Sequence, residues 1–404
     1  MHRLACLLIF GMGLVLGVTQ QAQSQSDFSV TDTQVTYLFG AEITIQAVIQ
    51  SVSPIKSAKV FLMSEGNSQP ESGEVLLGEN GEVYFHYEIT GVELRAFTEV
   101  LYWFEITTDA SEVMTSPSFT FYYTDNRFAW QTIEQAPFRV HWYMEREDLG
   151  QEVLDAVQGG LTRIQSFFPV ETPVSLDIYV YSTAQDLQTA LGGSRKGLIS
   201  GHADPDLGVV LIASSPDIGQ TLELQRNVFH ELAHVLLYNY LDGEGYGRLP
   251  LWLNEGLASV VEPQPNPDYI YLLEVAHKEE TLLPISSLCA SFPQDAHSRV
   301  LAYAQSTSFV NYIQSRYSAE GIQKLLEAYK KGESCENAPQ VALGTSLNQL
   351  EKEWRLETFN ESMFLGNLIS MLPWIVLLVV ILATPLGMMV STKIKKRRTY
   401  AGGR

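Results

Sequence analysis

The chain contains two different patterns of hydrophobic and polar positions. Between residues 28 and 123, apolar and polar residues alternate, most clearly at 43–49 and 83–89. A period of two is typical of strands with one buried face. After residues 124–127, stripes of apolar residues at helical spacing alternate with short β-rich runs. The change in pattern predicts a boundary between two folded parts, and 404 residues are enough for two domains.

Residues 25–125 are predicted to form a β-sandwich of the immunoglobulin-like class. Several short strands separated by turn signals fall within about 100 residues, as in that class. The Cys pair of antibody domains is absent from this part, so the likeness is to the broader sandwich class. We see no chemistry here, and His86 is expected to be a surface or core histidine.

Residues 126–360 predict a second domain that mixes helices and strands, which makes the whole chain α+β. Strands are expected at 138–143, 174–181 and 208–213, and helices at 151–168, 183–191, 221–241, 251–259, 269–278 and 297–317.

The helix expected at 221–241 carries the sequence His-Glu-x-x-His. On a helix, positions i and i+4 lie on the same face, so His230 and His234 can bind one metal ion. Glu231 lies next to the first of them, where its carboxylate can reach a water molecule on that metal. The alternative is a buried amphipathic helix with two solvated or core histidines.

A second segment favours the metal site over a helix with two solvated or core histidines. A loop is expected at 242–247 from its glycines, and the helix expected at 251–259 then offers Glu255, twenty-one residues after His234. Catalytic zinc takes three protein ligands and keeps one position open for water. Two histidines and one glutamate are such a set.

The motifs HELAH and WLNEGLA resemble those of the gluzincin metallopeptidases, which include thermolysin and aminopeptidase N, and above all the smaller bacterial peptidase-MA-like domains. The resemblance covers about residues 128–357, up to a helix at 343–354 that Ser346 would cap. It implies one Zn²⁺ per chain, held by His230, His234 and Glu255, with Glu231 as the general base.

The resemblance also implies a substrate cleft beside the sheet. The strand at 209–212 would be the edge strand that pairs with an extended peptide. Aminopeptidase N relatives carry Gly-x-Met-Glu-Asn on this strand to hold a free amine, and no such motif occurs between 198 and 215. We therefore expect an endopeptidase.

Tyr303 is a candidate for a second catalytic residue. Aminopeptidase N relatives carry Tyr-x-Lys-Gly at a comparable place, and that Tyr binds the oxyanion; here Gln305 and Ser306 replace the Lys and the Gly. The alternative is an ordinary aromatic residue on a helix face. Some relatives also place a carboxylate one turn beyond the glutamate ligand, where Ser259 cannot supply the charge.

Composition narrows the class of protein. A hydrophobic content of 46% and an aromatic content of 11% exclude a disordered chain. The net charge is −20, and without the seven basic residues of the two chain ends it is −27. Such acidity argues against nucleic acid and anionic membranes as partners. We favour solubility as its role over an acidic recognition surface.

Both ends of the chain predict contact with a membrane. Residues 1–24 have the plan of a secretory signal peptide, with an uncleaved signal anchor as the alternative. Residues 363–392 contain no charge and are long enough for a transmembrane helix rather than a buried core helix. Residues 393–404 then form a basic cytoplasmic tail. A single-pass type I protein of the cell membrane is expected, with its catalytic part outside the cytoplasm.

The number of cysteines is consistent with a domain in an oxidising compartment outside the cytoplasm. Cys6 lies in the predicted signal, which leaves Cys289 and Cys335 to form a disulfide, with two buried thiols as the alternative.

The sequence thus predicts a membrane-anchored zinc metallopeptidase that acts on a peptide or protein substrate. Two other hypotheses remain open. In one, the chain is a non-proteolytic binding or assembly module with a degenerate or structural zinc domain. In the other, it hydrolyses a non-peptide substrate.

Overall fold

The computed structural model describes residues 28–359, apart from 68, 90–93, 193–198, 215–220 and 265, together with Trp374. The chain divides into two compact units, Met1–Thr124 and Asp125–Arg404. The predicted signal peptide, basic tail and, apart from Trp374, transmembrane segment lie outside the described residues. Among the residues that are described, none of the helices combines the length and the apolar character that a membrane span requires.

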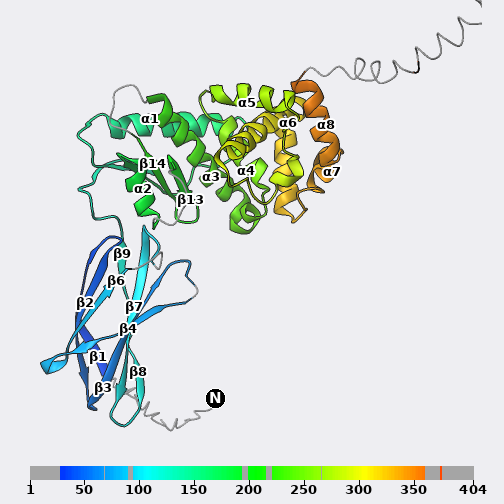
Figure 1. The fold of residues 1–404 in the computed structure, drawn as a ribbon. Helices are drawn as coiled ribbons and strands as arrows, with labels where there is room; N and C mark the ends of the chain where they lie inside the picture. The colour runs from blue at the N-terminus through cyan, green and yellow to red at the C-terminus, as the bar shows by residue number, and fades with distance from the viewer. Residues whose placement is uncertain are drawn as a thin grey trace, which may run out of the picture. The chain divides into compact units, whose positions relative to one another are not determined.

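The first unit consists of two antiparallel sheets (Figure 1). One has the order β1-β2-β6-β5 and the other the order β4-β3-β7-β8, and β9 also pairs with β7. The strands are β1 (Phe28–Leu38), β2 (Glu42–Ser51), β3 (Ile55–Ser64), β4 (Glu71–Glu74), β5 (Leu76–Leu77), β6 (Glu82–Glu88), β7 (Thr98–Thr108), β8 (Val113–Thr115) and β9 (Phe119–Tyr123). Alternate residues such as Ile43, Ile45 and Phe104 are fully buried, which confirms the strand pattern predicted for this part.

The second unit begins with a five-stranded mixed sheet of order β10-β11-β12-β14-β13. Its strands are β10 (Gln131–Gln135), β11 (Phe138–Trp142), β12 (Leu176–Tyr181), β13 (Gly201–Asp204) and β14 (Val209–Ala213). The strands β11, β12 and β14 are parallel, and β13 pairs antiparallel with β14.

The prediction of β14 as the edge strand is therefore wrong. A turn at 205–208 folds β13 back onto β14, so β14 lies between β12 and β13. β13 is short and polar, with the sequence Gly-His-Ala-Asp, and its pattern does not predict a strand.

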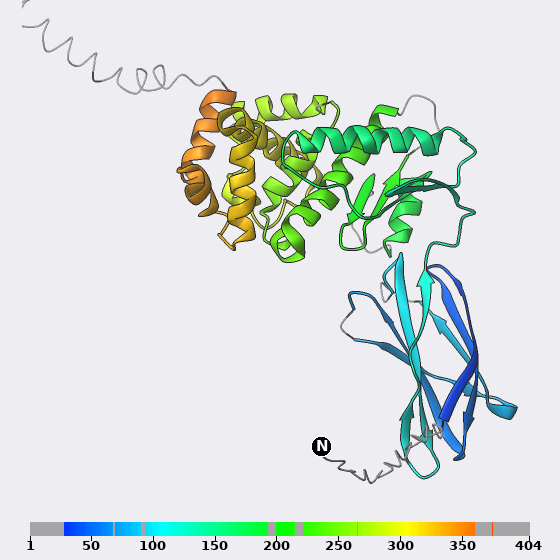
Figure 2. The ribbon, with the colours of Figure 1, turned by 180° about the vertical axis from the view of Figure 1, so that it is seen from behind.

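Helices cover this sheet and then form the rest of the unit (Figures 1 and 2). Helices α1 (Leu149–Gln165) and α3 (Thr221–Gly247) pack together on one face, and α2 (Ala184–Ala190) packs on β12 and β14. The remaining helices are α4 (Leu251–Val260), α5 (Pro267–Lys278), α6 (Ala296–Lys330), α7 (Ala338–Leu343) and α8 (Leu347–Thr358), which Ser346 caps. One continuous hydrophobic core joins the sheet to these helices.

Two helices run further than the sequence predicts. The loop expected at 242–247 is wrong, because α3 breaks at Asp242, where φ is 62°, and continues to Gly247. The Asp242 carboxylate accepts a hydrogen bond from the Gly245 amide at 2.9 Å and so starts a new helical turn. Helix α6 likewise continues past a break at Ser318.

A disulfide joins Cys289 to Cys335, as predicted, with 6.0 Å between their Cα atoms. The Cys289 carbonyl accepts a hydrogen bond from the Leu251 amide at 2.8 Å, at the first residue of α4. The covalent link joins the segment before α6 to the segment after it, and the hydrogen bond holds Cys289 against the start of α4.

Candidate metal centre

The His-Glu-x-x-His motif lies in the middle of α3. Helical spacing places His230 and His234 one turn apart, and their rings are 5.1 Å apart between centroids. His234 and Glu231 are both 8% exposed, which is unusual for ionisable side chains. The apolar residues of the same helix, including Leu232 and Leu236, are buried in the core and fix its orientation.

Helix α4 brings Glu255 to the two histidines. Trp252 is fully buried against Phe309 of α6, with 5.0 Å between ring centroids. Gly256 allows close packing of the two helices, because a Cβ atom there would lie 2.7 Å from the Ser306 carbonyl oxygen. Packing of α4 on α6 thus places Glu255 at the metal-binding face of α3.

His230, His234 and Glu255 offer ligand atoms that all lie within 4.8 Å of one another. Glu255 Oε2 is 3.4 Å from Nε2 of His230 and 3.9 Å from Nε2 of His234. Tetrahedral zinc with bonds of about 2.0–2.1 Å needs ligand atoms about 3.3 Å apart. The three side chains can therefore meet at one zinc ion with small adjustments.

Nδ1 of each imidazole, the outer ring nitrogen that faces away from Glu255, lies next to a hydrogen-bond acceptor. His230 Nδ1 lies 3.2 Å from Oε1 of Glu262, and His234 Nδ1 lies 3.1 Å from Oδ1 of Asn254. Since both acceptors are oxygens, each Nδ1 can donate its proton to one of them, which leaves Nε2 of each ring to bind a metal ion. This arrangement of donors and acceptors fits a metal ion.

Further side chains hold these acceptors. Arg226, one turn before His230 on α3, lies 3.4 Å from Oε2 of Glu262. The Tyr246 hydroxyl lies 3.3 Å from His234 Nδ1 and accepts a hydrogen bond from the Asn254 amide at 3.1 Å. Burial raises the Tyr246 pKa to about 12, so this hydroxyl stays protonated.

The charges at the centre also suit a divalent cation. Burial alone would raise the Glu255 pKa, but His234 and His230 and a hydrogen bond from Tyr303 hold it below its usual value. Burial disfavours a charged His230, yet its hydrogen bonds with Glu255 and Glu262 raise its pKa well above the ordinary value. The lowered Glu255 pKa reflects the neighbouring histidines, and the raised His230 pKa reflects the neighbouring carboxylates. A metal ion bound here would replace the proton on His230, because a metal ligand must be deprotonated.

Glu231 faces the edge strand of the sheet. A Cβ atom on Gly201 of β13 would lie 2.4 Å from Oε1 of Glu231, so a larger residue at this position would displace the Glu231 side chain. Among the described residues, the other edge of β13 pairs with no strand. Hence the edge strand of the sheet begins beside the candidate general base.

Tyr303 of α6 also reaches the centre. Its hydroxyl helps to lower the Glu255 pKa, burial raises the pKa of Tyr303 itself, and its ring packs edge-on against Phe292. Gln305, in contrast, bonds both backbone groups of Leu283 at 2.9 Å and takes no part in the site. The structure thus brings Tyr303 to the metal-binding face, and its role on the oxyanion stays a prediction.

The sequence reasoning missed Arg226 and four further residues of the site. Asn254 precedes Glu255 directly, and Glu262 follows it by seven residues, two turns of a helix, so their positions were available as signals. Tyr246 and Gly201 had no such signal, because the break in α3 and the β13–β14 turn place them here.

Comparison with known proteins gives a family and weak structural likenesses. No curated protein sequence matches this chain. An aminopeptidase N family protein from Idiomarina loihiensis matches with 9% identity and a TM-score of 0.37, over 75% of this chain and 69% of its own. OgpA from Akkermansia muciniphila matches with 17% identity and a TM-score of 0.20, and the match covers 25% of this chain and 30% of OgpA.

At these TM-scores the structural likenesses carry no argument about function. The family match is of another kind, because it covers residues 156–360, just over half of the chain, and includes all three candidate ligands, Glu231 and Tyr303. The chain therefore belongs to the Peptidase MA superfamily and has a metallopeptidase-like domain.

Proposed function

We propose that the protein is a zinc-dependent endopeptidase. The observation that carries the proposal is the convergence of His230, His234 and Glu255, with an acceptor already in place at the outer nitrogen of each imidazole. A buried carboxylate, Glu231, lies beside these ligands without belonging to them. A purely structural metal site has no use for such a base, which argues against the binding-module alternative.

Zinc, when bound, supplies a Lewis acid that polarises the scissile carbonyl and makes the attacking water more acidic. Glu231 takes a proton from that water as the oxygen attacks the carbonyl carbon, and it later delivers the proton to the leaving amine as the C–N bond breaks. Tyr303 donates its hydroxyl proton in a hydrogen bond to the oxygen that becomes negative. Glu262 and Asn254 keep both imidazoles in the correct orientation.

The position of β13 as the last strand of the sheet among the described residues supports a polypeptide substrate. The backbone groups of β13 can pair with an extended peptide, and Gly201 would hold that peptide beside Glu231. Its sequence, Gly-His-Ala-Asp, lacks the Gly-x-Met-Glu-Asn motif for a free amino terminus. We therefore propose cleavage within chains rather than removal of terminal residues.

The proposal includes the location of the enzyme. The signal-like start and the apolar segment at 363–392 favour a single-pass type I protein of the cell membrane, with the sandwich, of immunoglobulin-like class, and the catalytic unit outside the cytoplasm. Protease added to intact cells should remove the unit that contains Glu231. Protection of that unit would contradict this topology.

Metal analysis and hydrolysis together test the function. The purified protein should hold about one zinc per chain and cleave casein, and His234→Ala or Glu255→Ala should lose both. Full zinc occupancy in both variants would place the metal elsewhere. Zinc binding without cleavage of any member of a peptide library would favour the binding module or a non-peptide substrate.

A further inference from the structure

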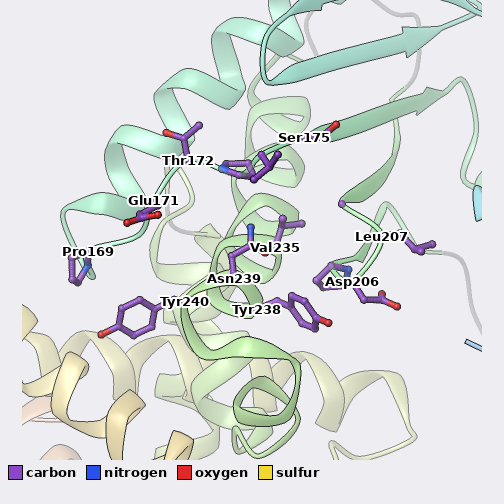
Figure 3. A pocket seen from close by; sticks show the side chains of 14 residues that line it. Pro169, Glu171, Thr172, Ser175, Asp206, Leu207, Val235, Tyr238, Asn239 and Tyr240 are labelled. Carbon is purple, nitrogen blue, oxygen red and sulfur yellow. The ribbon is translucent and has the colours of Figure 1, made fainter. Parts of the chain in front are cut away.

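A groove of about 610 Å³ lies beside α3, at some distance from the metal ligands along the helix. Its walls are the loop at 169–175, the turn at 205–208 between β13 and β14, and the side chains of Val235, Tyr238 and Tyr240 (Figure 3). This volume lies within the range of about 300–1,000 Å³ that is usual for ligand pockets.

The groove lies along the same strip of α3 as the candidate general base, Glu231. Glu231, Val235 and Tyr238 follow one another at spacings of four and three, so they form one strip along α3. β13 runs along this strip from Gly201, opposite Glu231, to the turn whose residues line the groove. At about 3.3 Å per residue, the four residues of β13 bridge about 10–13 Å. A peptide paired with β13 therefore reaches the groove about three to four residues from the scissile bond.

The charged side chains that line the groove are acidic, and Arg139, which donates to the lining Ser175 at 3.3 Å, is paired with Asp177 at 2.5 Å. Among its lining residues, all of them described, Glu171 and Asp206 are the ionisable acids, and none is Lys, Arg or His. Figure 3 places Glu171 and Tyr240 on one side and Asp206 and Tyr238 on the other. The nearby Lys330 donates to the Tyr240 carbonyl oxygen at 3.3 Å and pairs with Asp242 at 3.5 Å. Carboxylates next to aromatic faces suit cationic side chains.

We propose that this groove binds a lysine- or arginine-rich segment of the substrate polypeptide, about three to four residues from the bond that is cleaved. The inference rests on the proposed peptidase function and adds a class of substrate to it. Glu171 and Asp206 attract the basic side chains, and Tyr238 and Tyr240 line the same groove, where aromatic rings can contact the stems of those side chains. The overall acidity of the chain favours encounter with the same substrates.

Peptide binding to a full-length Glu231→Gln protein tests the proposal without turnover. Two fluorescent peptides share one central sequence and differ in the flank beyond it, which is lysine-rich in one and glutamine-rich in the other. Fluorescence anisotropy gives Kd for each peptide. The double change Glu171→Gln and Asp206→Asn should raise Kd for the lysine-rich peptide about five- to tenfold at low ionic strength, and less at physiological salt. Kd for the glutamine-rich peptide should not change.

A matched control changes the same total charge elsewhere. Glu145 and Glu147 are exposed and follow β11, whereas the groove lies where β12 and β14 begin. Because these strands are parallel, the two sites lie at opposite ends of the sheet. Glu145→Gln with Glu147→Gln should therefore leave both Kd values unchanged.

Three results would overturn the inference: an unchanged Kd for the lysine-rich peptide, an equal loss for both peptides, or an equal loss in the control. Its failure can be told from that of the proposed function. Casein cleavage without a shift in Kd would reject the groove and keep the peptidase. Selective binding of the lysine-rich peptide by a protein that cleaves nothing would keep the groove and reject the peptidase function.

Discussion

In the N-terminal sandwich, the buried polar side chains of the described residues carry hydroxyls, whereas the second unit also buries carboxylates and a histidine. Ser116 is typical of the first group, since its Oγ accepts from the Phe104 amide at 2.9 Å and donates to the Pro117 carbonyl at 2.7 Å. Glu231, His234 and Glu262 represent the second, at 6–8% exposure.

This difference between buried hydroxyls and buried charges indicates which buried side chains are candidates for a chemical role. A buried hydroxyl needs one or two backbone partners and then stabilises the fold. A buried charge costs far more to desolvate and requires a partner of opposite charge or a metal. Asp125 in the second unit has such a partner in Arg127, at 2.6 Å. Glu231 lies instead beside three candidate metal ligands, and the proposed role in catalysis would account for its burial.

Loss of the general base should have the largest effect. Glu231→Gln should keep zinc and the fold, because Glu231 is not one of the three candidate ligands. A neutral amide cannot take the proton of the attacking water, so kcat should fall about 10²–10⁴-fold. Steady-state kinetics with elemental analysis provide the measurement. Activity near that of the wild type would remove Glu231 from the mechanism.

Tyr303→Phe should have the next largest effect. If the hydroxyl binds the oxyanion, kcat should fall about 10²–10³-fold and KM should change little, because the interaction forms mainly in the transition state. The hydrogen bond to Glu255 offers another outcome, in which zinc affinity falls and added zinc restores kcat. An unchanged kcat would show that Tyr303 only packs in the core, since Phe fills the same space.

Glu262→Gln should weaken zinc binding about 10- to 100-fold, the range for side chains that orient a metal-bound histidine. The amide retains an acceptor for His230 Nδ1 but loses the charge that Arg226 and His230 face. Competition with a chelator measures the affinity. Asn254→Ala provides the comparison at His234, and equal affinities of both variants and the wild type would deny these contacts any role in metal binding.

The smallest effect is expected in the sandwich. Ser116→Ala leaves the Phe104 amide without its acceptor and should lower the free energy of unfolding of that unit by about 1–2 kcal/mol. Zinc content and kcat should stay at wild-type values. Urea unfolding followed in parallel with casein cleavage separates the two quantities, and a fall in kcat would contradict the division of roles between the units.

Local spacing in the sequence determined much of this protein. The alternation of Ile43 and Ile45 predicted strands, and the spacing of His230 and His234 predicted a shared face of α3, because both depend only on the geometry of one element. The pairing of Cys289 with Cys335 followed from their number. The roles of Glu231, Glu255 and Tyr303 stay predictions that the experiments above can test.

Only the tertiary structure decided the surroundings of these residues. The short, polar sequence of β13 did not predict a strand, yet β13 pairs with β14 as the edge of the sheet, and this placed Gly201 against Glu231. Glu262 and Tyr246 reach the histidines because α4 packs on α6 and α3 breaks at Asp242. Such contacts join segments far apart in the chain, and their free energy depends on how whole elements pack, which no local pattern of residues records.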